Sequence, residues 1–140
     1  MANKTTAKSI ITKQKEAIRL ISNASYRAHT KELFLKLKIL PFEKLILLER
    51  QKFMHKLYNK NQPLSFDDLW ITNANQNPTL TLRNANNYFI PPHNNELFLR
   101  CPLITFAKAW NDAIDTKFNP SLQVFLKEQS NHYLSELRNE

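Results

Sequence analysis

The strongest apolar pattern in the chain runs through residues 41–58 and predicts a helix that is buried on most of its sides. Leu40 precedes Pro41, and proline suits the first position of a helix because its missing N–H would have no partner there. At about 100° per residue, the apolar side chains fall in two arcs, one of Phe42, Leu45, Ile46, Phe53 and Leu57 and one of Leu47, Met54 and Tyr58. The remaining polar positions form a narrow seam that we expect to face solvent: Lys44, Gln51 and His55. A helix that is apolar around most of its circumference is normally buried among its neighbours, so this one is expected at the centre of the fold.

Three more segments have helical patterns. Residues 8–22 place five apolar side chains within an arc of about 120°, namely Ile10, Ile11, Ala17, Ile18 and Ile21. Thr30 suits the N-cap of a short helix that ends at Lys38, although residues 33–39 also alternate and leave a strand as the alternative. Pro120 and Ser121 open a last helix with one apolar arc, made by Leu122, Phe125, Leu126, Tyr133 and Leu137.

The middle of the chain is less regular. Ser65 can cap a brief helical turn through Trp70. Residues 71–96 are rich in asparagine and proline, with Thr79–Arg83 and Tyr88–Ile90 as candidate short extended pieces. Residues 97–110 are apolar again and are expected to fold back onto the core.

These patterns predict a mainly α protein. We expect a single helical domain over residues 1–140, with four to six helices and an irregular, weakly extended central excursion. Its parts are a frayed start at 1–7, a basic helical half at 8–70, the irregular excursion at 71–96, and an apolar return with a closing helix at 97–140.

Composition narrows the classes of function. The chain has no glycine, which disfavours phosphate-cradling loops and dinucleotide fingerprints. Asparagine can take the left-handed positions that glycine would otherwise occupy. Cys101 is the only cysteine, so we expect neither a disulfide framework nor a thiolate zinc site, and a reducing intracellular compartment, cytoplasm or nucleus, fits best. The N-terminal residues lack the apolar region of a signal peptide, and no apolar run approaches 18 residues, so no membrane association is expected.

The positive charge is concentrated in the first half of the chain. Residues 1–60 hold 14 Lys and Arg against 4 Asp and Glu, whereas residues 61–140 hold 6 against 8. Such a basic half attracts polyanions. Lys8, Lys15 and Arg19 fall within about 40° on the predicted first helix, and Lys44, Lys52 and Lys56 follow on the central one.

We take these six residues as candidate contacts to an RNA or DNA backbone, with a solvated helix face as the alternative. Tyr26 and Tyr58 are candidates for stacking on bases, or else core residues.

No catalytic or metal-binding arrangement emerges from the remaining residues. Histidines 29, 55, 93 and 132 lack metal-ligand spacing. Asp67 and Asp68 resemble a polymerase metal pair only in being adjacent acids, because no pair of apolar strands flanks them. We expect them at the start of a short helix, where its dipole favours acids, and Asp112 and Asp115 as surface acids. A nucleophile assembled from residues distant in sequence remains open.

A series of short motifs runs through about residues 14–138. The motif residues of the first half are Gln14, Lys15, Ala17, Ile18, Arg19 and Ile21; His29, Thr30, Leu33 and Phe34; Leu37, Ile39, Leu40 and Pro41; Phe53, Met54 and Lys56; and Pro63, Leu64 and Phe66. The motif segments of the second half are 82–91, 102–111 and 125–137. In this order the motifs resemble the C-terminal region of jockey-type non-LTR retrotransposon reverse transcriptases. Cys101-Pro102 departs from that pattern, because many members have glycine-proline there, so the resemblance does not define the local turn.

The resemblance implies a part of the polymerase that follows the thumb and holds the RNA template or target DNA. Bracing the polymerase is the other role that we expect for it. The catalytic aspartates of the family lie upstream, so none has a counterpart in this chain. We therefore expect no enzyme activity of its own, no cofactor and no small-molecule substrate. The expected partners are an RNA or DNA backbone and the upstream polymerase domain. The alternatives are a stand-alone helical scaffold whose basic half binds an acidic protein, and an enzyme with metal-dependent nucleotide incorporation.

Overall fold

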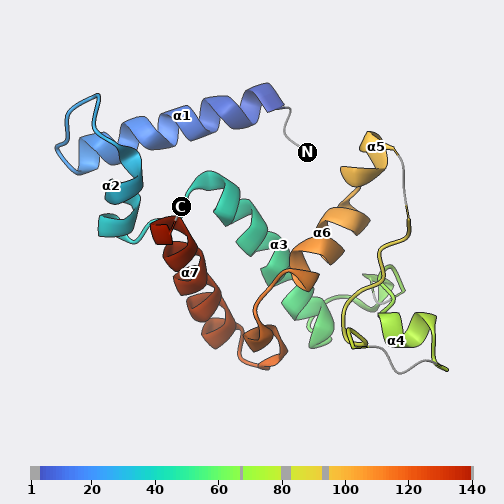
Figure 1. Cartoon of the computed structure of the whole chain (residues 1–140). Helices are drawn as coiled ribbons and strands as arrows, with labels where there is room; N and C mark the ends of the chain where they lie inside the picture. Colours follow the sequence, from blue (N-terminus) through green and yellow to red (C-terminus); the bar gives the residue numbers. More distant parts are fainter. Residues whose placement is uncertain (1–3, 67, 80–82, 93–94, 140) are drawn as a thin grey trace. The chain divides into compact units, whose positions relative to one another are not determined.

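The computed structural model describes residues 4–66, 68–79, 83–92 and 95–139. Within these ranges the regular structure is helical, and the only β-contact is an antiparallel bridge between Thr72 and Tyr88 (Figure 1). The expected mainly α class is confirmed. Five helices of eight or more residues lie in the described ranges, namely α1 (Lys4–Ile21), α2 (Thr30–Leu37), α3 (Phe42–Tyr58), α6 (Pro102–Asn111) and α7 (Leu122–Asn139). The shorter ones are η1 (Leu64–Phe66), α4 (Asn73–Gln76), α5 (Glu96–Leu99) and η2 (Asp115–Phe118).

Two helix starts differ from the expected positions. The first helix begins at Lys4, so residues 4–7 are helical and not part of a frayed start. The central helix begins at Phe42, one residue after Pro41, whose carbonyl accepts the first helical hydrogen bond from Leu45 N at 3.0 Å. Differences of this size are usual at helix ends, where the last turns fray.

The second helix is confirmed against the strand alternative, but its cap is not the expected one. His29 occupies the N-cap position in an extended conformation, and its side chain makes no capping hydrogen bond. Thr30 is therefore the first helical residue.

The irregular middle of the chain matches the prediction in outline. The turn expected from Ser65 to Trp70 is a shorter 3-10 helix, η1. Tyr88 is extended as expected and bridges Thr72, with Phe89 N donating to Ile71 O at 2.8 Å. Most of the other candidate extended piece, residues 80–82, lies outside the described residues.

The chain divides into two compact units. The first unit consists of Met1–Ile46 and Lys127–Glu140, and the second of Leu47–Leu126. In the first unit α2 folds back against α1 (Figure 1). Ile18 of α1, Phe34 of α2 and Leu137 of α7 form its buried cluster.

One amide connects α1 to the segment between α2 and α3. Gln14 donates its Nε2 hydrogen to Leu40 O at 3.0 Å and accepts from Phe42 N at 2.9 Å through Oε1. The side chain thus pairs with the chain on both sides of Pro41, which has no N–H of its own.

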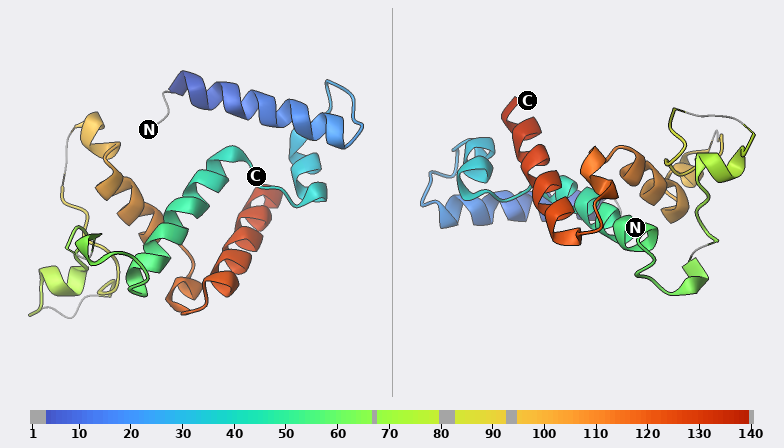
Figure 2. Two further views of the ribbon diagram at one scale, coloured as in Figure 1. Left: turned by 180° about the vertical axis from the view of Figure 1, so that it is seen from behind. Right: turned by 90° about the horizontal axis from the view of Figure 1, so that it is seen from below.

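The second unit is built around aromatic rings. The second part of α3 lies beside α6 in both views of Figure 2. Met54 and Leu57 of α3 and Trp110 of α6 are buried together with Ala107 and Tyr88. Phe53 packs edge-on against three rings at its margin, those of Phe66, Trp70 and Phe106.

The prediction of a solvent-facing seam on α3 is wrong for Gln51 and His55. Gln51 and His55 are each only 1% exposed. Gln51 Nε2 donates to Ala109 O at 2.9 Å, and His55 Nε2 lies 2.7 Å from Asn119 O, so this nitrogen carries the donated hydrogen. The His55 ring also stacks on Phe125, with ring centroids 5.0 Å apart. Hydrogen bonds to backbone carbonyls let these polar groups enter the core.

Among the helices that the structure describes, three end in a left-handed residue that is not glycine. Asn23 after α1, Lys38 after α2 and Lys60 after α3 have φ of 49°, 53° and 54°. Each end has the two hydrogen bonds of a Schellman motif. The expected use of asparagine in place of glycine is thus confirmed at Asn23, while two lysines do the same.

The left-handed lysine after α2 predicts a stabilising substitution. A residue with a Cβ pays about 1–2 kcal/mol in this conformation, so Lys38→Gly should raise the free energy of unfolding by about 0.5–1 kcal/mol after the entropy of the freer unfolded chain is subtracted. Lys36→Gly is the matched control, because Lys36 is inside α2, where glycine should cost about 1 kcal/mol. Urea unfolding measures both, and a destabilised Lys38→Gly variant would contradict the prediction.

Phe53 should be a centre of stability in the second unit. Its ring contacts three other aromatic rings, so Phe53→Ala should lower the free energy of unfolding by about 3 kcal/mol. Leu20→Ala is the control, because Leu20 is 81% exposed and should change stability by no more than about 0.5 kcal/mol. Equal effects of the two substitutions in denaturant unfolding would show that the Phe53 contacts contribute little.

Candidate nucleic-acid interface

Two lysines of the predicted basic stripe are exposed on α1. Lys8 and Lys15 are exposed, and the described residues include no ion pair with either. They are seven residues apart, which places them on the same face of the helix. A pair of free ammonium groups on one helix face is suited to successive phosphates of a nucleic-acid backbone.

Arg19, the third residue of the stripe, has a structural role as well. It is half-buried, and its Nε donates to Ala28 O at 3.1 Å. Its guanidinium carbon lies 5.8 Å from the centroid of the Tyr26 ring. Arg19 therefore fixes the connection between α1 and α2 and holds a cation beside an aromatic ring.

The two candidate stacking residues differ in their surroundings. Tyr58 packs on Trp110 and Phe118, with ring centroids at 5.4 and 5.7 Å. Tyr26 is 80% exposed. It borders a shallow, mainly apolar pocket of about 290 Å³ whose other lining residues are Glu16, Arg19, Leu20 and Ala24.

Lys44 is engaged within the first unit. Its Nζ lies 2.7 Å from Glu136 Oε2 and 5.0 Å from the centroid of the Tyr133 ring. The hydrogen bond from Lys44 is the main reason that the pKa of Glu136 is lowered from its ordinary value, with His132 adding to the effect. A lysine already paired with a carboxylate offers less charge to a phosphate than Lys8 or Lys15 does.

The two remaining candidates belong to the second unit. Lys52 pairs with Glu49 at 3.2 Å, three residues earlier on α3. Lys56 is half-buried on the same helix. The six predicted contacts are therefore divided between the units, with Lys8, Lys15, Arg19 and Lys44 in the first.

The candidate metal chemistry has no counterpart in the described residues. They contain no group of three or more His, Cys, Asp or Glu side chains that would hold a metal ion. Asp67 and His93 lie outside the described residues. Asp68 is exposed in a turn after η1, so it does not begin a helix as expected.

None of the helices in the described residues is long and apolar enough to cross a bilayer.

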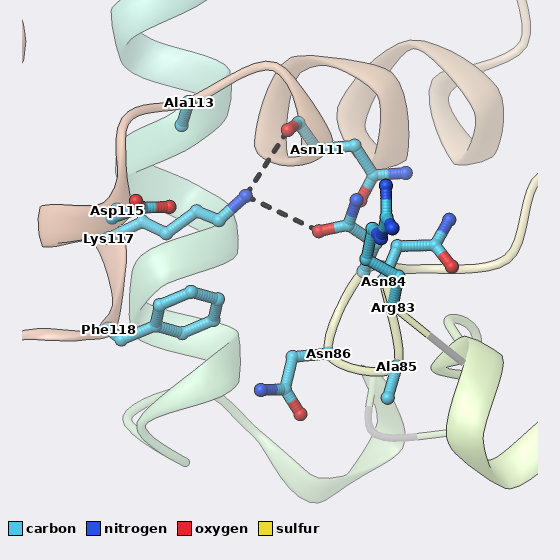
Figure 3. Close-up of a pocket in the computed structure, with 10 residues that line it drawn as sticks. Arg83, Asn84, Ala85, Asn86, Asn111, Ala113, Asp115, Lys117 and Phe118 are labelled. Carbon is cyan, nitrogen blue, oxygen red and sulfur yellow. Dashed lines mark hydrogen bonds between the residues drawn. The ribbon is translucent and has the colours of Figure 1, made fainter. Parts of the chain in front are cut away.

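Sequence reasoning missed a polar pocket around Lys117 (Figure 3). Lys117 is 4% exposed, and its Nζ donates to Trp110 O, Asn111 O and Asn87 Oδ1 at 3.0, 3.2 and 3.4 Å. The pocket has a volume of about 440 Å³ and is lined mainly by the asparagine-rich turn at residues 83–87 and by residues 111–118. Burial lowers the pKa of Lys117, while Asp115 and Asp112 act in the opposite direction.

The contacts of Lys117 identify it as a cap of α6. Two of its three acceptors are carbonyls of the last two residues of that helix. Trp110 O also accepts from Ala113 N at 3.1 Å, and Lys117 supplies a donor to Asn111 O, one of the carbonyls that a helix end leaves without an intrahelical donor. A cation at this end also interacts favourably with the helix dipole. No sequence signal marks this role, because Lys117 reaches Asn87 across 30 residues of chain.

Lys117→Met should therefore destabilise the second unit. Methionine has a similar length but removes the three hydrogen bonds that Lys117 donates, and only Trp110 O keeps another donor, Ala113 N. The free energy of unfolding should therefore fall by about 2 kcal/mol. Lys108→Met on the exposed side of α6 is the control and should have little effect. A Lys117→Met variant as stable as the parent in thermal unfolding would mean that desolvation of the ammonium group offsets its three hydrogen bonds.

Comparisons of the sequence and the structure with known protein families, curated proteins and solved structures found no match.

Proposed function

We propose that this chain binds nucleic acid through the exposed basic face of α1, as the C-terminal accessory region of a non-LTR retrotransposon reverse transcriptase. The observation that carries the proposal is the pair Lys8 and Lys15, exposed on one helix face and outside every ion pair of the described residues. The chain has no catalytic site of its own in this proposal. Its partners are the RNA template or target DNA and the upstream polymerase domain.

The contacts of Gln14 support the link to this family. Gln14 belongs to the first motif of the resemblance, and Leu40-Pro41 belongs to a later one. The Gln14 amide bonds to the backbone on both sides of Pro41. Two motifs on which the resemblance rests are thus in contact, which gives a physical reason for their occurrence together.

A protein partner is the second candidate, because apolar side chains are exposed at the end of α1. Leu20 is exposed together with Ile21, and a group of apolar residues beside charges is typical of a protein-interaction surface. In this alternative the basic half binds an acidic protein. Affinity for nucleic acid at moderate salt distinguishes the two candidates, since a protein scaffold should have almost none.

The direct test removes the two exposed lysines. Each phosphate that is neutralised contributes about −0.7 (single strand) to −0.9 (duplex) to the slope of log affinity against log salt. Lys8→Gln with Lys15→Gln should therefore flatten the slope by roughly 1.4–1.8 units and weaken all sequences alike. Arg19 is left in place because it also fixes Ala28. Fluorescence anisotropy with labelled RNA and DNA at several salt concentrations measures the slope.

The matched control removes the same charge elsewhere. Lys108 and Lys127 are exposed on α6 and α7, and their double Gln variant should keep the parent slope. An unchanged slope in a folded Lys8→Gln and Lys15→Gln variant would exclude α1 as the binding face and favour Lys52 and Lys56. If the parent binds neither RNA nor DNA at low salt, the proposal is overturned.

A further inference from the structure

The exposed ring of Tyr26 stands in a connection that is otherwise well braced. Asn23 closes the end of α1 in the left-handed conformation, and Ala24 N donates to Arg19 O at 2.9 Å. Ala28 N donates to Ser25 O at 2.9 Å, and Ala28 O accepts from Arg19 Nε. Tyr26 is therefore held on a fixed backbone while its ring faces solvent.

The residues beside Tyr26 combine apolar surface with positive charge. Leu20 is exposed and lines the same pocket as Tyr26, and the adjacent residue Ile21 is exposed as well. Single exposed apolar residues are ordinary, but a group of them marks a binding surface. Arg19 belongs to this surface through its contact with the Tyr26 ring and to the basic stripe through its place on α1.

The stripe leads along α1 toward this ring. Lys8 and Arg19 are 11 residues apart, or roughly 16 Å at the rise of an α-helix. Proteins that bind single strands combine a cationic track for the backbone with aromatic side chains on which bases stack. In a duplex the faces of the bases are covered by their neighbours, and a surface tyrosine would find no free face except at an end.

We propose that Tyr26 is a base-stacking platform and that the ligand of the α1 surface is single-stranded nucleic acid, RNA or DNA. This inference rests on the proposed function and specifies its substrate class. The phosphates follow Lys8 and Lys15 toward Arg19, and one base lies against the ring of Tyr26.

The lining of the pocket beside Tyr26 favours a base over a phosphate. Glu16 is part of that lining, and its carboxylate is paired with Lys13 at 2.8 Å. A carboxylate repels a phosphate, but it accepts hydrogen bonds from the N–H groups of bases, including the ring N–H of thymine and uracil. Arg19 and Leu20 supply a cationic and an apolar contact to the face and edge of a planar ring.

The test compares two single strands that share a backbone and differ in their bases. One probe is a 12-nucleotide oligothymidine, and the other is a 12-nucleotide abasic strand with the same phosphates. The parent should bind the abasic strand more weakly, roughly 5- to 150-fold, because stacking of one base is lost. Tyr26→Leu should bind oligothymidine more weakly by a similar factor and the abasic strand with the parent affinity. Tyr26→Phe keeps the ring and should keep the parent affinity for both.

A 12-base-pair duplex and an oligouridine complete the set of probes. The duplex should be bound with little dependence on Tyr26, and similar affinities for oligouridine and oligothymidine would extend the site to RNA. Binding of the oligothymidine and abasic strands with equal affinity by the parent and by Tyr26→Leu would overturn the stacking proposal while leaving the phosphate contacts intact. Failure of the parent to bind any probe at low salt would instead overturn the proposed function, and Tyr26 with Leu20 would then belong to a protein interface. Circular dichroism confirms that the variants are folded.

Discussion

The second unit depends on two hydrogen bonds from the buried polar face of α3. Gln51 donates to the carbonyl of Ala109 in α6, and His55 donates to that of Asn119, just before α7. A rotation of α3 about its axis would break both bonds. Leaving each of these polar groups buried without its partner would cost about 1–3 kcal/mol. The aromatic pairs around Trp110 prefer edge-to-face or offset geometries, and each adds only about 0.5–1.5 kcal/mol beyond its buried area. The two polar bonds add a stricter condition on the rotation of α3, because each needs one donor aimed at one carbonyl.

Periodicity predicted the apolar part of this arrangement and failed on the polar part for a clear reason. Met54, Leu57 and Phe125 were expected in the core from helical spacing alone, and all three are buried. The same rule assigned Gln51 and His55 to solvent because it treats every polar residue as exposed. Their partners lie 58 and 64 residues further along the chain, and no local pattern contains that information.

In the candidate site, too, features set by local helix geometry were predictable and features set by distant contacts were not. Helical spacing was sufficient to place Lys8 and Lys15 on one face, because their positions depend only on the geometry of α1. The role of Arg19 depends on how the chain returns at Ala28, and the exposure of Tyr26 depends on the same connection. Neither follows from residue type. The ion pair between Lys44 and Glu136 could not be predicted from a local sequence pattern either, because the two residues are 92 positions apart.

The three left-handed helix ends without glycine also affect the state from which the protein folds. Glycine gives an unfolded chain more backbone conformations than any other residue, so its absence narrows the unfolded ensemble. Within the described part of the chain, left-handed strain is confined to Asn23, Lys38 and Lys60, whereas the reduction in unfolded-state entropy extends over the whole sequence. A small protein without glycine loses less conformational entropy when it folds. The accompanying cost is the unfavourable backbone conformation at these three helix ends.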